Sequence, residues 1–266
     1  RSKGKLPKST TSDVIAFPSF RTFVSAASSA KTLPVFLPPV RRRTDNTACG
    51  TVGGGTYNNP KPRHEWCFDW SSQLGLVVNQ IYWCLEVEEA FDKIAAGDAG
   101  AMKKYNEQQV QQITDLIATT RRDLDKPSRQ KIMNMITIDA HSRDMVIGII
   151  ENGETSKKCF KWMSQLRTYW DADIDDSVIK ICDASFPYGY EYLGNSMRLV
   201  VTPLTDRCYI TLTMGLRLFL GGAPAGPAGT GKTETTKDLA RALALPCYVY
   251  NCSDQMNYQT MADIFK

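Results

Sequence analysis

The sequence lacks the features that mark several common classes of protein. No run approaches 18 uninterrupted apolar residues, which argues against a membrane span. Eight cysteines are present, but none forms a Cys-x-x-Cys pair and no secretory signal is visible, so reduced, mostly buried thiols are favoured. There are only two histidines, His64 and His141. His64 and Cys67 have no matching pair at zinc-finger spacing, which argues against a zinc site.

Charge is unevenly distributed along the chain. The formal net charge is +4, but residues 1–65 carry 11 Lys and Arg against 3 Asp and Glu, whereas residues 66–266 carry 21 against 25. Residues 1–65 are also rich in Ser and Pro and have few periodic apolar faces, so we predict a disordered basic segment. Arg41-Arg42-Arg43 leaves open a nuclear-localisation or nucleic-acid patch, the acid-poor composition an organellar transit peptide, and a solvated linker is the simplest interpretation.

Apolar periodicity predicts a helical domain over residues 66–175. Residues spaced by three and four predict helices over about 71–96, 99–124, 125–153 and 156–169, with Ile117 and Phe160 among the side chains expected to face inward. Each helix has one apolar face to bury, so we expect a helical block. His141 is interpreted as a hydrogen-bonding structural residue rather than a general base. The aspartate-rich run 171–176 departs from a calcium loop and is interpreted as a solvated connector.

The periodicity changes after residue 176. Short β-branched and aromatic runs predict strands at 178–186, 188–193 and 198–202, followed by a helix over 205–220. A second helix over 232–245 and a buried strand over 247–251 complete the pattern. The predicted fold class is α/β with an all-α N-terminal part.

The most specific motif is Gly-Pro-Ala-Gly-Thr-Gly-Lys-Thr at residues 226–233. It fits the phosphate-loop pattern G-x-x-x-x-G-K-[ST], a match expected by chance with a probability on the order of 1%. Its glycines permit positive φ and close approach of phosphate to the backbone, and the helix that follows directs its N-terminal N–H groups at the same anion. Lys232 supplies charge to the β- and γ-phosphates, and Thr233 a hydroxyl to Mg²⁺. The sequence therefore predicts a site for ATP and Mg²⁺.

Hydrolysis needs groups beyond this loop. Phosphoryl transfer also requires an acidic residue for the metal, a group that orients water, and usually an arginine. Only 33 residues follow Thr233. We therefore assign no catalytic residue to the chain, and expect it to bind ATP without turnover by itself. Because the chain opens on Arg1 and stops at Lys266 inside a helical pattern, we interpret it as a piece of a longer protein.

Four stretches carry a family resemblance. Tyr188-Gly-Tyr-Glu-Tyr-Leu-Gly-Asn-Ser196, Thr202-Pro-Leu-Thr-Asp-Arg-Cys-Tyr209, the run 221–239 and Asn251-Cys-Ser-Asp254 resemble the dynein heavy chain where its linker meets the first AAA+ module. Parts of 70–88, 138–144 and 162–170 resemble the end of the linker. Gly194-Asn195 and Glu234-Thr-Thr-Lys-Asp238 resemble axonemal rather than cytoplasmic dyneins. The chain departs from the family at Ser71, Ser72 and Met197, and residues 1–65 do not resemble the linker.

The resemblance implies a division of the chain and a set of nucleotide contacts. Residues 66–175 would be the linker-end domain, and residues 176–266 the truncated N-terminal part of a P-loop AAA+ ATPase module. The segment Pro203-Leu204-Thr205 would lie against the adenine. The residues assigned to the nucleotide are Gly226, Pro227, Ala228, Gly229, Thr230, Gly231, Lys232, Thr233, Glu234, Pro203, Leu204 and Thr205, with Thr233 also assigned to Mg²⁺.

The resemblance further implies a minus-end-directed microtubule motor of cilia or flagella that couples ATP hydrolysis to movement. Implied partners are microtubules, reached through other parts of the heavy chain, dynein intermediate, light intermediate and light chains, and other heavy chains. The implied location is the cytoplasm and cytoskeleton, in the axonemal dynein complex. Walker B, arginine-finger and sensor residues would lie beyond Lys266.

Two alternatives remain from the residues alone. One is a non-hydrolysing nucleotide-binding scaffold, which a hydrophobic strand ending in Asp-Glu beyond Lys266 would argue against. The other is a nucleic-acid-stimulated P-loop ATPase. The basic segment lacks interleaved stacking aromatics and residues 66–266 are net acidic, which argues against a nucleic-acid partner.

Overall fold

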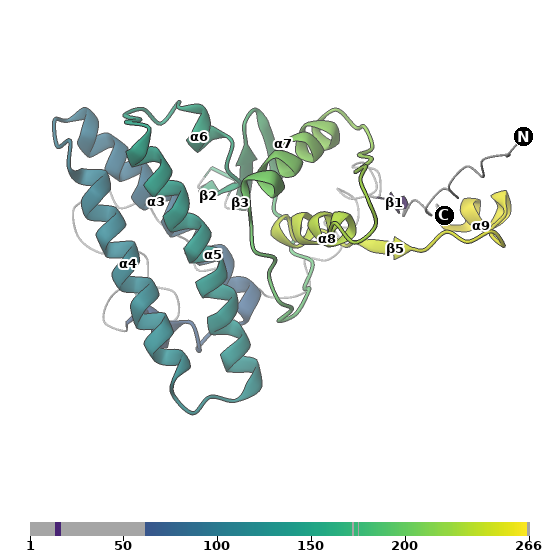
Figure 1. Ribbon diagram of the computed structural model, residues 1–266, viewed down its shortest axis with the longest axis horizontal. Coiled ribbons are helices and arrows are strands. Elements are labelled where there is room, and N and C mark those ends of the chain that lie inside the picture. The colour runs from purple at the N-terminus through teal and green to yellow at the C-terminus, as the bar shows by residue number, and fades with distance from the viewer. Residues whose placement is uncertain (1–13, 17–61, 172, 175, 265–266) are drawn as a thin grey trace, which may run out of the picture.

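The fold is that of a computed structural model of the chain, which describes residues 14–16, 62–171, 173–174 and 176–264. Figure 1 shows α3 (Ser72–Ala95), α4 (Ala101–Thr120) and α5 (Lys126–Glu151) at one end of the molecule. At the other end lie β5 (Tyr248–Tyr250) and α9 (Tyr258–Ile264), and β1 (Val14–Ala16), the first described element, lies beside β5. Three long helices lie side by side at one end, a small sheet lies in the middle, and two shorter helices follow. The expected disorder of residues 1–65 falls almost wholly outside the described residues.

The helical block is built from α2 (Arg63–Trp66), α3 (Ser72–Ala95), α4 (Ala101–Thr120) and α5 (Lys126–Glu151). The three long helices agree with the predicted ranges to within a few residues. α5 starts after Asp125 with Pro127 in its first turn, where proline costs no hydrogen bond because the first N–H groups of a helix have no partner within it. None of the described helices is long and apolar enough to span a membrane.

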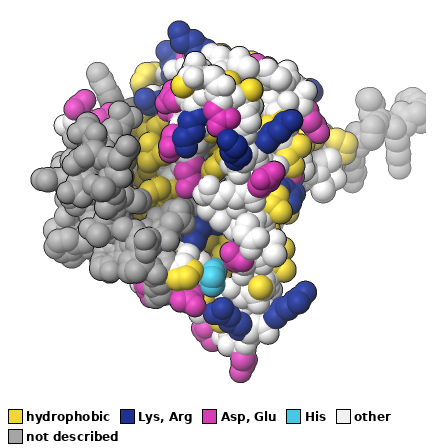
Figure 2. Space-filling model, turned by 90° about the vertical axis from the view of Figure 1, so that its left-hand side faces the viewer, with side chains coloured by type: hydrophobic (Ala, Val, Ile, Leu, Met, Phe, Trp, Pro, Cys, Tyr) yellow, Lys and Arg dark blue, Asp and Glu magenta, His cyan; other side chains and the backbone are white. Residues whose placement is uncertain are grey.

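Two apolar clusters fill the block. One centres on Trp83, Phe91 and Trp162, and the other on Trp66 and Ile132. Ile117, which was expected to face inward, is 45% exposed. The buried face of α4 runs through Ile113 and Leu116 instead. Figure 2 shows Lys and Arg interspersed with Asp and Glu on the described surface of the block that faces the viewer. The block therefore has an apolar interior and, on this face, a mixed-charge exterior.

Residues 156–169 do not form the single helix that was predicted. They form the short helix α6 (Phe160–Met163), after which the chain enters strand β2 (Arg167–Asp171). The Cys182 N–H donates to the Met163 carbonyl at 2.7 Å, so the end of α6 is held by the sheet instead of by a further helical turn. Trp162 is fully buried, whereas Phe160, expected to face inward, is 71% exposed.

The sheet pairs β2 with β3 (Asp176–Ile181) and β3 with β4 (Ala184–Pro187), both antiparallel. The predicted strand 178–186 is therefore two strands, joined by a turn in which Cys182 has a φ of 45°. Asp171 pairs with Asp176 across the first hairpin, so the ends of the aspartate-rich run belong to strands rather than to a solvated connector. The predicted domain boundary between residues 175 and 176 lies in this hairpin and stays a prediction.

Residues 188–202, which we call the connecting segment, were predicted to contain two strands but form none. Their backbone groups pair with other parts of the fold. The Gly189 N–H donates to the Leu243 carbonyl at 2.9 Å, and the Arg198 N–H donates to Asn134 Oδ1 at 3.0 Å. Apolar β-branched composition did not decide the conformation here, because side chains and a helix end supply the hydrogen-bond partners.

Two helices follow the connecting segment: α7 (Pro203–Arg217) and α8 (Lys232–Ala242). They pack with the sheet around a third apolar cluster, whose buried members include Ile179, Phe186, Tyr209, Leu239 and Leu243. This cluster fixes α7 and α8 relative to one another. The exposed stretch between them, residues 218–231, contains residues 226–231 of the phosphate-loop motif, and the last two residues of the motif begin α8.

The predicted buried strand at 247–251 appears as β5 (Tyr248–Tyr250), but it is not buried. Tyr248 is 57% exposed and Tyr250 is 38% exposed. Among the described residues β5 pairs with β1 (Val14–Ala16) alone, antiparallel, so it is not a central strand of a sheet there. β1 is the one described part of the segment predicted to be disordered that lies before residue 62. α9 (Tyr258–Ile264) ends the described chain.

Candidate nucleotide site

The phosphate loop has the backbone conformation that its glycines predicted. Gly229 and Gly231 have φ values of +78° and +79°, in the left-handed region where a Cβ is unfavourable. A Cβ at either position would meet no atom within 4 Å. Glycine is therefore required by the curl of the chain, while the open space around both residues leaves room for an anion to approach the backbone.

The N-terminus of α8 has no side-chain cap, which leaves its first N–H groups available to an anion. Gly231 is its N-cap, and it has no side chain with which to accept a hydrogen bond from the first turn. The first N–H groups of a helix lack partners within it and carry the positive end of the helix dipole. A phosphate group that accepted from these N–H groups would take the place that a Ser or Asp side chain takes at an ordinary N-cap.

Lys232, the first residue of α8, turns its ammonium group toward the loop. Its Nζ donates to the carbonyls of Gly226 and Pro227 at 3.0 Å and 2.7 Å. The Thr230 hydroxyl also donates to the Pro227 carbonyl, at 2.9 Å. The loop is thus held by charge-assisted and neutral hydrogen bonds within itself, and Lys232 supplies the one cation among these donors.

Glu234 and Thr233, two neighbouring residues of the predicted site, have different surroundings in the structure. The Glu234 carboxylate is 56% exposed and accepts from Lys237 Nζ at 2.8 Å, and this hydrogen bond lowers the pKa of Glu234. Glu234 therefore pairs with Lys237 on the surface of α8. Thr233 is partly buried in the first turn, next to Lys232. A magnesium role for its hydroxyl stays a prediction, since Mg²⁺ takes most of its ligands from water and phosphate.

The residues predicted to contact adenine form the start of α7. Pro203 and Leu204 are exposed, with Leu204 71% exposed, so both present apolar surface. Thr205 is buried and forms a capping box with Thr202: the Thr205 N–H donates to Thr202 Oγ1 at 3.3 Å, and the Thr202 N–H to Thr205 Oγ1 at 3.0 Å. The Thr205 side chain is thus committed to the helix, and an adenine contact fits Pro203 and Leu204 better.

Sequence reasoning missed the residue that joins these two parts of the site. Asp238 on α8 is fully buried, and it accepts a hydrogen bond from the Tyr209 hydroxyl on α7 at 2.8 Å. A signal was present: an aspartate next to Leu239 on the buried side of an amphipathic helix requires a partner, because an unpaired buried carboxylate is costly.

His141 links the helical block to α7. Its Nε2 lies 3.1 Å from Gln165 Oε1 and 3.8 Å from Asp206 Oδ1. Burial raises the pKa of Asp206, and the neighbouring His141 opposes this effect. The interpretation of His141 as a hydrogen-bonding structural residue is confirmed. The contact also brings α5 next to Asp206, which follows Thr205 in the first turn of α7.

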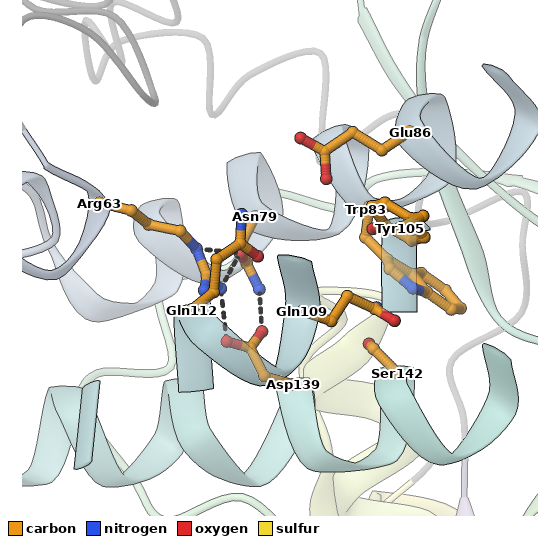
Figure 3. Close-up of a pocket in the computed structure, with 9 residues that line it drawn as sticks. All are labelled: Arg63, Asn79, Trp83, Glu86, Tyr105, Gln109, Gln112, Asp139 and Ser142. Carbon is orange, nitrogen blue, oxygen red and sulfur yellow. Dashed lines mark hydrogen bonds and ion pairs between the residues drawn. The ribbon is translucent and has the colours of Figure 1, made fainter. Parts of the chain in front are cut away.

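A small polar cavity lies inside the helical block, away from the phosphate loop (Figure 3). Arg63 Nη2 donates to Asp139 Oδ2 at 2.6 Å, and Asn79 Nδ2 donates to Asp139 Oδ1 at 2.9 Å, which ties α2, α3 and α5 together. Burial raises the pKa of Glu86, at the edge of this cavity, to about 7. The cavity has room for about one water molecule, so it is not a nucleotide site.

These features define a class of protein. A loop with left-handed glycines and a lysine at the start of a helix, next to an apolar helix start, is a P-loop nucleotide-binding module. Comparison with known families agrees: residues 188–266 match the family described as the hydrolytic ATP binding site of dynein motor region.

Individual relatives extend the match into the helical block. The chain is 68% identical over 206 residues to the dynein alpha chain of the flagellar outer arm of Chlamydomonas reinhardtii, covering 77% of this chain and 4% of that protein. It is 52% identical over 213 residues to dynein axonemal heavy chain 9 of Homo sapiens, covering 80% of this chain and 5% of that protein. The chain belongs to the dynein heavy chains of axonemal type, and spans about one twentieth of the length of these relatives.

Proposed function

We propose that the chain binds ATP with Mg²⁺ at the loop 226–233 and forms the junction between the linker and the first AAA+ module of a dynein heavy chain. The observation that supports this most is the loop itself, with left-handed Gly229 and Gly231 leading into α8. The N–H groups of the first turn and Lys232 would hold the β- and γ-phosphates, Thr233 would contact Mg²⁺, and Pro203 and Leu204 would lie against adenine. Bound Mg²⁺ would neutralise phosphate charge.

We further propose that the heavy chain carrying this segment is a minus-end-directed microtubule motor that couples ATP hydrolysis to ciliary or flagellar movement. The names of the relatives support this: they are flagellar outer-arm, ciliary and axonemal dyneins. Microtubules, other heavy chains, and intermediate, light intermediate and light chains would be its partners in the axoneme. Residues 66–175 would act as the linker end and residues 176–266 as the start of the ATPase module.

A non-hydrolysing scaffold remains the second candidate function, because none of the described residues is assigned to orient an attacking water. A nucleic-acid-stimulated ATPase is less well supported. On the face of the block in Figure 2, cationic and anionic side chains alternate, whereas a nucleic-acid track would be a stripe of one sign.

The test is the substitution Lys232→Ala, with ATP affinity measured by titration calorimetry in the presence of Mg²⁺. Removing the loop's cation should lower the affinity at least about a hundredfold, since charged hydrogen bonds to phosphate are lost at two oxygens. Lys237→Ala is the matched control, because Lys237 lies on the same helix and pairs with Glu234 on its surface. Unchanged ATP affinity in a folded Lys232→Ala protein would exclude the proposed site.

A further inference from the structure

Asp238 has an environment that ordinary helix packing does not require. It lies in the middle of α8 with 0% exposure, and its carboxylate contacts three groups from outside that helix. Oδ2 accepts from the Tyr209 hydroxyl at 2.8 Å and from Arg198 Nη2 at 3.2 Å, and Oδ1 accepts from the Leu199 N–H at 3.2 Å. A buried carboxylate with three donors is stable, but replacing its partners by apolar groups would often be no worse for the fold.

The positions of the three donors along the chain indicate what Asp238 connects. Arg198 and Leu199 belong to the connecting segment, five and four residues before α7 begins at Pro203, and Tyr209 lies on α7 itself. One side chain of the phosphate-loop helix therefore holds both the approach to α7 and the body of α7. The first turn of α7 contains Pro203 and Leu204, so Asp238 connects the helix that starts at Lys232 to the element expected to meet adenine.

The connecting segment is held on its other side by the helical block. Asn134 on α5 is 3% exposed, accepts from the Arg198 N–H at 3.0 Å and donates to the Ser196 carbonyl at 2.9 Å. Arg198 is thus fixed at its backbone by the block and at its guanidinium by Asp238. With both ends held, the distance from the phosphate loop to the start of α7 is set by these bonds.

We propose that Asp238 is a positioning residue for the nucleotide: it sets the placement of Pro203 and Leu204 relative to the phosphate loop, so that one ATP can contact both. This proposal rests on the proposed ATP site. A ligand that bridges two elements gains from both contacts only if their separation is fixed before it binds. Asp238 would not touch the ligand, and it would affect adenine binding far more than phosphate binding.

The test compares ATP with inorganic tripolyphosphate, which has the phosphates but no adenosine. Both affinities are measured by calorimetry with Mg²⁺ for the wild-type chain and for Asp238→Asn, which keeps the side-chain volume and removes the charge. The expected result is an ATP affinity about tenfold lower and a tripolyphosphate affinity within about twofold of the wild-type value. Asp144→Asn is the matched control, because Asp144 is 63% exposed on α5, and neither affinity should change.

A second variant keeps the test decisive if Asp238→Asn does not fold. Tyr209→Phe removes one donor and leaves Arg198 and Leu199 in place, so the ATP affinity should fall about threefold and the tripolyphosphate affinity should not change. Equal losses for the two ligands, or no loss for either, would show that Asp238 serves only the fold of α8 and would overturn the proposal. Equal affinities of the wild-type chain for the two ligands would overturn it too. A wild-type chain that binds neither ligand would instead exclude the proposed ATP site.

Discussion

The helical block and the nucleotide part of this chain are stabilised in different ways. The block, with α6 packed against it, buries three tryptophans, Trp66, Trp83 and Trp162, in two apolar clusters. The nucleotide part, residues 188–264, shares one apolar cluster with strands β3 and β4, and its phosphate loop is exposed throughout residues 226–231. The block should therefore contribute most of the free energy of unfolding, and the nucleotide part most of the ligand specificity.

The two parts meet through polar contacts as well as through apolar packing. Gln73 on α3 donates to the Glu191 carbonyl at 2.7 Å and accepts from the Leu193 N–H at 2.9 Å, and Gln130 on α5 donates to the Asn195 carbonyl at 2.7 Å. These side chains satisfy backbone groups that would otherwise need a neighbouring strand. A segment without regular structure can thus keep a fixed path, because the block supplies its hydrogen-bond partners.

The largest effect that would separate the two parts is expected from Trp162→Ala. Trp162 has 0% exposure, its ring lies 5.1 Å from the Trp83 ring and 6.4 Å from the Phe91 ring, and its removal would leave a cavity. The free energy of unfolding should fall by about 3–5 kcal/mol, measured by chemical denaturation. ATP affinity, measured at a temperature where the variant is folded, should stay within about threefold of wild type.

Phe160→Ala is the matched control for Trp162→Ala, since Phe160 lies on the same short helix and is 71% exposed. Its effect on stability should be below about 0.5 kcal/mol. A folded Trp162→Ala protein that had lost ATP binding would contradict the separation, because it would show that packing in the block determines the geometry of the loop.

An intermediate effect is expected from pH, through Glu86 in the block. Burial raises the pKa of Glu86 from 4.5 to about 7, against the opposing effects of the Tyr105 hydroxyl and Arg63. The folded state therefore binds the Glu86 proton more tightly than the unfolded state does. Its contribution to stability is fully present below about pH 4.5 and is lost as the pH rises through about 7.

Glu86→Gln should remove this pH dependence, since the amide does not titrate. Between pH 5 and pH 8 the free energy of unfolding of wild type should fall by about 2–3 kcal/mol relative to the variant, as measured by urea denaturation of both proteins at each pH. The comparison between the two proteins cancels the titration of all other groups. Parallel pH profiles for the two proteins would show that Glu86 is ionised in the folded state at pH 5.

Much of this organisation could be predicted from the sequence, and the reasons for success are local. The spacing of apolar residues is a strong indicator of long helices, so α3, α4 and α5 were found, and Asp125 with Pro127 marked the start of α5. The phosphate loop was found because its chemistry needs particular residues at fixed spacing. Its left-handed Gly229 and Gly231 follow from the same requirement.

The failures occurred where distant parts of the chain decide the structure. Residues 167–169 were predicted to continue the helix of their upstream neighbours, but they belong to β2 because β3 supplies a partner strand. The connecting segment has the composition of a strand, yet its partners are Gln73, Asn134 and Asp238. The role of Asp238 depends on donors that lie 29 to 40 residues away in the sequence. Local patterns carry no information about such contacts.

The smallest effect on stability, and the sharpest test of the comparison, is expected from Gly229→Ala. Gly229 has a φ of +78° with no atom within 4 Å of its would-be Cβ, so the substitution strains the backbone without a steric clash. The left-handed conformation costs a residue with a Cβ about 1–2 kcal/mol, and because the loop is exposed it can relax away from that conformation. ATP affinity should fall about fivefold to tenfold while the free energy of unfolding changes by less than about 1 kcal/mol.

Gly221→Ala is the control, since Gly221 has equally open surroundings but no positive φ, and the ATP affinity of this variant should not change. Equal ATP affinities for the two alanine variants would mean that the loop binds phosphate without its left-handed curl, and the phosphates would then be held by the first turn of α8 alone.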